Sequence, residues 1–259
     1  MEIKETYKFE TEPLLTKCKA IRKNMITKQC IIVSNLDNPK VKDYLINFTN
    51  CCYNRMLDIF DDTIYLLDKK RIPSACTISR AMIETHAFLV LTIDNVNKIL
   101  EKKETNRVEI INTILKSINS SKFKYDDQTK VKNKIIKIED YNFTPSAQER
   151  MLNEESVKTH VNDALKHLYK LEIENGRTTE IKTEAHSEHL YNLLSEWVHP
   201  SQISLFTNYA NDTHKISCSL GIVDILDLAE YLCIQALDYI DMLEKNYKII
   251  LNLAKTLPE

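Results

Sequence analysis

Glycine is almost missing from this chain, and that shortage limits the folds that it can adopt. Only two glycines and six prolines occur among its 259 residues. Rossmann folds, P-loops and β-sandwiches need glycine at tight turns and close backbone approaches, so the composition argues against all three. Hydrophobic residues make up 43% of the chain, enough for a sizeable core in one large domain or two closely packed ones. We therefore expect an all-α protein.

The spacing of apolar residues predicts a helical bundle of about seven to eight helices. Breaks are expected where proline or glycine interrupts the pattern, as at Pro39 and Gly176. The short link at residues 71–74 favours an antiparallel pair of helices on either side of it. The predicted helices cover about residues 13–36, 40–69, 74–103, 144–174, 185–198 and 221–257, with two shorter helices between 98 and 137.

The exception to the helical pattern lies near residues 203–220. Two short runs, 203–209 and 214–220, flank the turn residues Asn211 and Asp212. This arrangement is typical of one small β-hairpin. We expect it to be the only sheet, and we expect the last helix to begin at Gly221.

The charge is unevenly distributed, although the whole chain has a net charge of only −2. Residues 98–137 contain eleven Lys or Arg and five acids. We predict a single helical domain over residues 1–259 with a basic helical insert around 98–140. Two interpretations of the insert stay open: a solvated helical surface, or a basic patch for the backbone of RNA or DNA.

The cysteines and the apolar runs indicate the cellular compartment in which the protein works. Seven cysteines occur, an odd number, with no C-x-x-C pair. We expect reduced, buried thiols in a cytoplasmic protein. Zinc would need clustered Cys or His ligands, so we expect no metal, and no motif indicates a cofactor. The N-terminus has no apolar signal core, and the longest apolar runs fall short of the about 20 residues of a membrane span. No membrane is therefore expected as a partner.

A few polar residues interrupt stretches that are otherwise apolar. Arg80 and Glu84 lie four residues apart in a helix that is apolar on nearly every side, so they share a face. Tyr191, Ser195 and His199 share a face of a later helix in the same way. A buried arginine without a partner is very costly. We therefore expect Arg80 to pair with Glu84 and the later helix to satisfy the groups that remain.

Two interpretations of these residues stay open. They form a satisfied polar network that fixes the register of the helices, or they form a functional site. In a site, His199 would act as an acid or base near pH 7 at a helix end that a ligand can reach, and Arg80 would hold a phosphate or a carboxylate. His86 lies amid apolar residues, where burial favours a neutral, hydrogen-bonded ring. Ser195 lacks the glycine-flanked elbow of a nucleophile.

The R-x3-E pair of Arg80 and Glu84, together with the Y-x3-S-x3-H-P run from Tyr191, resembles a group of uncharacterised all-helical bacterial proteins. More distantly, it resembles the HEPN helical domains of toxin–antitoxin and phage-defence systems. The resemblance covers roughly residues 40–250. Catalytic members of that family are metal-independent ribonucleases with an R-x4–6-H motif, and they usually work as dimers. Arg80 and His86, with five residues between them, match that spacing.

The resemblance implies a HEPN-like protein of bacterial defence or toxin–antitoxin type, and the most specific form of this hypothesis is a metal-independent ribonuclease. Arg80 would stabilise the charge of the phosphorane, and His86 or His199 would transfer protons. Glu84, Tyr191 and Ser195 complete the candidate site. RNA, a second copy in a homodimer and a partner protein are the expected partners. The alternative is a non-catalytic module for ligand binding or protein interaction, and a purely structural bundle is the third hypothesis.

Overall fold

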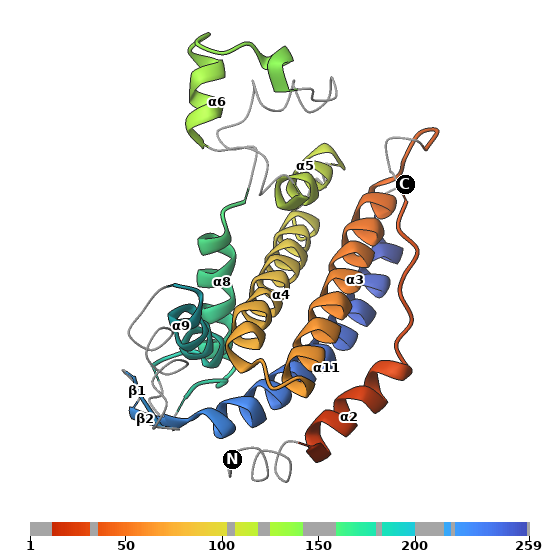
Figure 1. The fold of residues 1–259 in the computed structure, drawn as a ribbon. Coiled ribbons are helices and arrows are strands. Elements are labelled where there is room, and N and C mark those ends of the chain that lie inside the picture. The colour runs from red at the N-terminus through yellow and green to blue at the C-terminus, as the bar shows by residue number, and fades with distance from the viewer. Residues whose placement is uncertain are drawn as a thin grey trace.

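The structure is a computed structural model, and it describes residues 12–31, 36–102, 107–118, 125–141, 159–179, 183–199, 215–218 and 221–257. Within these ranges the chain forms eight α-helices, one short 3-10 helix and one pair of short strands (Figure 1). The prediction of an all-α protein is confirmed. The division into one domain with a basic insert stays a prediction.

Three long helices form the centre of the bundle: α3 (Val41–Asp68), α4 (Ile72–Leu100) and α11 (Ile225–Thr256). They pack against one another along their lengths (Figure 1). Helix α3 ends because Lys70 adopts a left-handed conformation with φ 58°. Two hydrogen bonds close this end, from Lys70 N to Leu67 O at 2.9 Å and from Arg71 N to Leu66 O at 2.8 Å. Pro73 lies in the first turn of α4, so the predicted antiparallel pair is confirmed, with a link shorter than the predicted residues 71–74.

Helix α4 is the central element, as its apolar pattern predicts. It packs against α3 and α11, and also against α5 (Arg107–Ile118), α8 (Val161–Glu174) and α9 (His186–Val198). By length and composition alone it could cross a membrane, and 56% of its most apolar 18-residue window is buried inside the bundle. The sequence contains no unbroken apolar run of that length, so this property belongs to the helix as a whole. Burial by its neighbours is what a core helix requires.

Helices α8 and α9 cover one side of α4, and a glycine turn shapes the connection between them. Gly176 has φ +71°, a conformation that other residues rarely adopt. Gly176 N donates to Ile173 O at 3.1 Å, and Arg177 N donates to Glu172 O at 2.8 Å. This is the Schellman pattern of a helix end, so the predicted stop at Asn175-Gly176 is confirmed. The turn brings Arg177 back over the end of α8.

The first described helix, α2 (Glu12–Lys23), is shorter than predicted. Residues 24–31 were expected to be helical, but they form a non-helical segment that lies along α3. Three asparagines on one face of α3 bind the main chain of this segment, which offers its backbone groups an alternative to a helix. Lys28 N donates to Asn54 Oδ1 at 2.7 Å, Asn54 Nδ2 donates to Lys28 O at 2.8 Å, Asn50 Nδ2 donates to Gln29 O at 2.8 Å, and Ile31 N donates to Asn47 Oδ1 at 2.7 Å.

The predicted hairpin around Asn211 and Asp212 is not supported. Its first run, 203–209, and its turn lie outside the described residues. The structure instead pairs β1 (Lys215–Cys218) with β2 (Gly221–Asp224) in antiparallel register. Gly221 therefore belongs to a strand, and the last helix begins later, at Ile225.

The basic region divides into parts with different surroundings. Helix α5 packs on α3 and α4, and its Ile110 and Ile114 are fully buried in the core. Helix α6 (Tyr125–Lys132) and the 3-10 helix Ile138–Tyr141 lie beyond the end of the bundle at which α5 packs (Figure 1). The predicted split at residues 119–121 and the predicted helix start at Thr144 fall outside the described residues.

Candidate functional site

The side of α4 that faces α9 carries a cluster of three predicted residues: Arg80, Glu84 and Tyr191, here named the Arg80 cluster. Arg80 Nε lies 3.3 Å from Glu84 Oε1 in an ion pair. Arg80 also donates from Nη2 to the Tyr191 hydroxyl, and its guanidinium carbon lies 4.4 Å from the centre of the Tyr191 ring. Tyr191 donates to Glu84 Oε1 at 3.0 Å. Residues 111 positions apart in the sequence thus meet as predicted.

The Arg80 cluster is only partly buried, which corrects the expectation of a buried ion pair. The Arg80 and Glu84 side chains are 21% and 30% exposed, because α9 covers this face of α4 without sealing it. Burial, and then the nearby Glu84 carboxylate, raise the pKa of Tyr191. Tyr191 therefore keeps its proton and donates it to Glu84. Each charged group has a partner of opposite character, as a register-fixing network requires.

Ser195 and His199 do not join this cluster. Ser195 Oγ donates to the carbonyl oxygen of Tyr191 at 2.6 Å, within its own helix. His199 is the exposed residue at the end of α9, where φ −99° and ψ 153° end the helical geometry. Eight residues of α-helix rise about 12 Å, so the face that Tyr191 and His199 share is too long for both to reach one phosphate. The structure assembles three of the six predicted site residues.

His86 lies on another side of α4. It is 3% exposed, and its ring meets Tyr239 edge-on at 5.4 Å between centroids. Burial, and then the charge of Arg177, lower its pKa to about 4, so the ring is neutral at pH 7. Its Nδ1 is buried without a hydrogen-bond partner among the described residues, so the expectation of a hydrogen-bonded ring is wrong. Residues six apart on a helix point about 120° from each other, and Arg80 and His86 accordingly face different neighbours.

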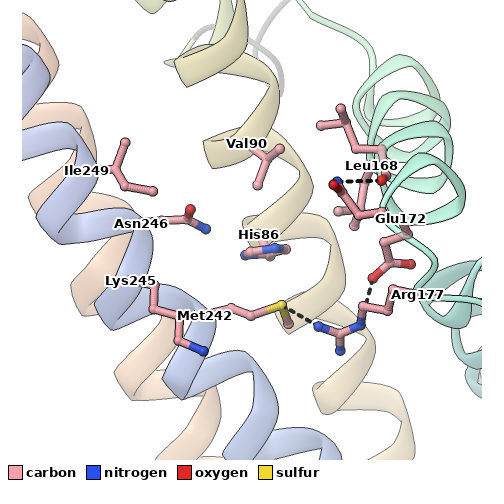
Figure 2. Close-up of a pocket in the computed structure, with 11 residues that line it drawn as sticks. His86, Val90, Leu168, Glu172, Arg177, Met242, Lys245, Asn246 and Ile249 are labelled. Carbon is pink, nitrogen blue, oxygen red and sulfur yellow. Dashed lines mark hydrogen bonds and ion pairs between the residues drawn. The ribbon is translucent and has the colours of Figure 1, made fainter.

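His86 lines a pocket of about 340 Å³ between α4, α8 and α11 (Figure 2). We name it the His86 pocket. The exposed side chains of Lys245 and Ile249 lie at its solvent side. Its apolar lining consists of Val90, Leu168, Leu171, Met242 and Ile249. Its polar lining consists of His86, Glu172, Asn175, Arg177, Lys245 and Asn246.

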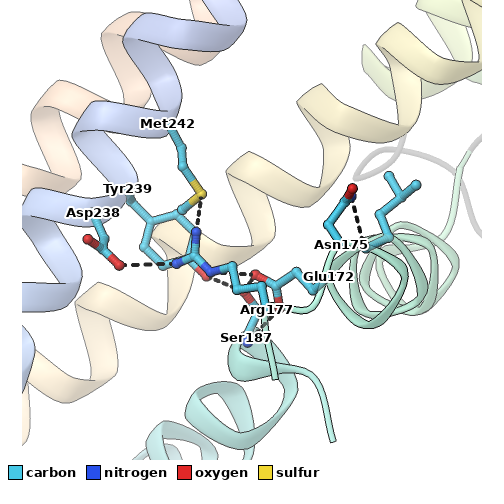
Figure 3. Close-up of polar contacts among 8 residues, drawn as sticks. Glu172, Asn175, Arg177, Ser187, Asp238, Tyr239 and Met242 are labelled. Carbon is cyan, nitrogen blue, oxygen red and sulfur yellow. Dashed lines mark hydrogen bonds and ion pairs between the residues drawn. The ribbon is translucent and has the colours of Figure 1, made fainter. Parts of the chain in front are cut away.

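Arg177 lines the His86 pocket, and its side chain joins α8 to α11 (Figure 3). Its Nε lies 3.2 Å from Glu172 Oε1 on α8, and its Nη2 donates to Asp238 on α11 at 3.1 Å. Its Nη1 donates to the sulfur of Met242 at 2.8 Å. The glycine turn at Gly176 positions this side chain, and two carboxylates compensate its charge.

Glu172 is a buried carboxylate, 5% exposed, that caps the first turn of α9. Ser187 donates to it twice, from the backbone N at 2.7 Å and from Oγ at 2.8 Å. Since the Ser187 proton goes to Glu172, the Tyr239 hydroxyl donates to Ser187 Oγ at 2.7 Å (Figure 3). Burial raises the pKa of Tyr239, which keeps it a donor. A negative group at a helix N-terminus is stabilised by the unpaired N–H groups and the helix dipole.

The sequence analysis missed Glu172, Arg177 and Asn246. One signal was available for Glu172, because it lies on the stripe of α8 that Leu165 and Leu168 occupy, where an acid is unexpected. Arg177 follows the glycine stop directly, but nothing in its spacing indicates Asp238 as a partner.

A second hollow lies between the start of α3 and the end of α11. It has a volume of about 610 Å³, and three lysines line it, Lys42, Lys248 and Lys255. Among the described residues, no group of three or more His, Cys, Asp or Glu could hold a metal ion.

The fold and the pocket define a helical-bundle protein with a buried histidine beside a small, largely apolar pocket. The chain belongs to the family of unknown function DUF5677, whose model matches residues 47–216. The match includes the Arg80 cluster, His86 and Arg177, and it ends before α11. No curated protein and no solved structure matches the chain.

Proposed function

We propose that this protein is a HEPN-like helical module of bacterial defence or toxin–antitoxin type, working in the cytoplasm, that binds a small ligand in the His86 pocket. The observation that carries the proposal is the buried His86 Nδ1, which has no partner among the described residues. A buried polar atom without a hydrogen bond costs free energy. Because His86 lines a pocket, a ligand bound there can supply the hydrogen bond that the neutral imidazole lacks.

The size and lining of the pocket suit a small organic molecule. A volume of about 340 Å³ lies at the lower end of the range of roughly 300–1,000 Å³ for ligand pockets. Aliphatic side chains and the Met242 thioether supply most of the surface. Such a pocket binds the apolar body of a ligand and leaves orientation to a few polar groups.

The charges around the pocket favour a neutral ligand. Arg177 is already engaged by Glu172 and Asp238, and Lys245 pairs with Asp241 at 2.6 Å. The uncharged groups are the ones with capacity to spare. His86 is neutral, and the half-buried Asn246 makes no hydrogen bond to the described part of the chain. Both offer a donor and an acceptor, so the matching ligand has an amide-like edge on an apolar or aromatic body.

Three probes of one shape and different charge test this proposal: benzamide, benzoate and benzamidine. Benzamide should bind with a dissociation constant of about 1 mM, as a fragment of nine heavy atoms can. Chemical-shift changes in protein NMR spectra should then centre on residues around His86. Asn246→Leu removes the amide and keeps the branched shape of the side chain, so it should weaken benzamide at least about fivefold.

The matched control is Asn252→Leu, which replaces an asparagine further along α11 that lines the lysine hollow instead. It should leave benzamide affinity unchanged. Absence of any shift near His86 with all three probes, or tighter binding of benzoate than of benzamide, contradicts the proposal.

The second candidate function is a metal-independent endoribonuclease, and the part-exposed Arg80 cluster favours it. With 21% of its side chain exposed, Arg80 can meet a phosphate from solvent, and the lysine hollow adds positive charge for an RNA backbone. Because His199 lies about 12 Å along α9 from Tyr191, a complete site would take its histidine from a second copy. This candidate therefore includes a homodimer, and a partner protein would act as its inhibitor.

Labelled single-stranded RNA, incubated with EDTA, tests the second candidate. Cleavage in EDTA that depends on Arg80 and His199 supports it, with His160→Ala as the control for an exposed histidine elsewhere. Light scattering at high micromolar concentration should give the mass of a dimer. A monomer without cleavage leaves ligand binding as the function.

A further inference from the structure

Two of the cysteines form a pair that contrasts with the others. Cys30 lies in the non-helical segment 24–31, Cys51 lies on α3, and both are exposed. Their sulfur atoms are 3.6 Å apart. The expectation of buried thiols is therefore wrong for these two. It is confirmed for four other cysteines, Cys18, Cys52, Cys76 and Cys233.

Hydrogen bonds hold Cys30 in place beside α3. Asn54 binds both backbone groups of Lys28, and Asn50 binds the carbonyl of Gln29. Asn54 Nδ2 also lies 3.3 Å from the sulfur of Cys30. Hydrogen bonds to the main chain of residues 28 and 29 and to the Cys30 sulfur therefore keep the two thiols together.

The surroundings give the two sulfur atoms different chemical roles. Burial, and then the hydrogen bond and charge of Cys30, raise the pKa of Cys51 to about 11. Cys51 thus keeps its proton and donates it to Cys30 Sγ. Cys30 accepts this hydrogen bond as well as the one from Asn54, and its own thiol donates to the carbonyl of Lys28 at 3.8 Å.

We propose that Cys30 and Cys51 are a thiol modification site, at which a small-molecule disulfide such as oxidised glutathione converts the pair into an intramolecular disulfide. The sulfur atoms must approach from 3.6 Å to the bonded distance of about 2.05 Å. Rotation of two exposed side chains supplies that movement. The product fastens segment 24–31 to α3 by a covalent bond.

The reaction proceeds by two thiol–disulfide exchanges. The Cys30 thiolate attacks one sulfur of oxidised glutathione, a bond forms between them, and the first glutathione leaves as a thiolate. Cys51 then loses its proton to solvent and attacks Cys30 Sγ, which releases the second glutathione. The protein loses two electrons and two protons, and one glutathione disulfide becomes two thiols.

Peptide mass spectrometry of the full chain, equilibrated in glutathione redox buffers, tests the proposal. The wild-type protein and Cys52→Ala should both yield a linked pair of peptides containing Cys30 and Cys51. Cys52 is the matched control, because it neighbours Cys51 but is buried. Oxidation should also raise the melting temperature by about 5 °C, since the disulfide closes a loop of 21 residues.

Two single variants test the assigned roles. Cys51→Ser should accumulate glutathione on Cys30, because the second thiol is missing. Cys30→Ser should take up glutathione on Cys51 more slowly, because burial, the largest cause of the raised pKa of Cys51, remains in this variant. A link that disappears in Cys52→Ala, the absence of any link, or equal rates in the two single variants would overturn the proposal.

Discussion

The two polar regions on α4 differ in how completely they are satisfied. In the Arg80 cluster, each of the three side chains bonds to the other two, and the charged pair remains 21% and 30% exposed. In the His86 pocket, a ring that is 3% exposed keeps one nitrogen without a partner in the described structure. Arg80 Nε also lacks a hydrogen bond in the described structure, but it lies 3.3 Å from the Glu84 carboxylate in an ion pair, and the neutral His86 ring has no such partner there.

The difference separates groups that hold the fold from groups that have binding capacity left. A satisfied network fixes the register of two helices and gains little from a further partner. A buried atom without a hydrogen bond gains the most when a ligand supplies one. For this reason we assign ligand binding to the His86 pocket, although the Arg80 cluster is the more conspicuous pattern in the sequence. Four measurements sharpen the contrast.

The largest effect is expected at Glu172. Glu172→Ala should lower the free energy of unfolding by about 3–4 kcal/mol, because it leaves Arg177 and the first turn of α9 without their buried carboxylate. Urea denaturation measures the change. Glu174→Ala is the control on the same helix: its side chain is 54% exposed and 3.8 Å from Lys170, so its cost should stay below about 0.5 kcal/mol. Equal losses in the two variants would mean that Glu172 does not organise this region.

The second effect concerns pH. The pKa of His86 is about 4 in the folded chain against an ordinary value of 6.5, so between these values the unfolded chain binds more protons. Stability should therefore fall as the pH drops from 6.5 to 4, by about 3 kcal/mol from this group. His86→Phe keeps a ring against Tyr239 and removes the titration. The free energies of unfolding of the two proteins, measured by denaturation across this pH window, should diverge by that amount. Parallel pH dependences would show that burial does not lower the pKa of His86.

A smaller effect is expected in the Arg80 cluster. Glu84→Ala should cost about 1–2 kcal/mol, because the pair is part-exposed and Tyr191 still contacts the guanidinium. Tyr191→Phe should cost about 1 kcal/mol through the loss of its hydroxyl. Tyr65→Phe, at a side chain that is 60% exposed, is the control without effect. A loss near 4 kcal/mol for Glu84→Ala would mean that the Arg80 cluster is the more deeply buried of the two regions.

The smallest effect on stability is expected at His199. Its side chain is exposed at the end of α9, so His199→Ala should change the free energy of unfolding by less than about 0.5 kcal/mol. If the chain cleaves RNA, the same change should abolish cleavage, whereas His86→Ala should mainly lower stability. Cleavage lost at His86 with stability lost at His199 would assign the activity to the Arg80–His86 spacing instead.

Local patterns made part of this structure predictable. The apolar spacing predicted the long central helices, and Gly176 and the link before Pro73 marked where helices end. The four-residue spacing of Arg80 and Glu84 predicted their pairing, because that rule operates within one helix. Tyr191 was one of three residues of the later helix, with Ser195 and His199, that were expected to satisfy the remaining groups. The helix ends and the Arg80–Glu84 pair were predictable because their causes lie within a few residues.

The errors have the opposite character. The helical pattern of α2 stops early because asparagines of α3 bind the following main chain, and only the folded chain brings them together. The network around Arg177 joins α8, α9 and α11, so no window of sequence contains it. His199 was expected near Arg80 because it shares a face of its helix with Tyr191, but the distance between them along that helix was not considered.

The asparagines of α3 bind residues 28–31 mainly through the main chain, and Asn54 also contacts the sulfur of Cys30. Hydrogen bonds to the main chain depend on the backbone conformation of the bound segment more than on the identity of its side chains. Substitutions at positions 29 and 31 should therefore be tolerated during evolution, with proline at position 31 as the exception, because Ile31 donates its N–H group. The N-terminal segment can thus change its surface chemistry from one relative to the next while it stays docked in the same place.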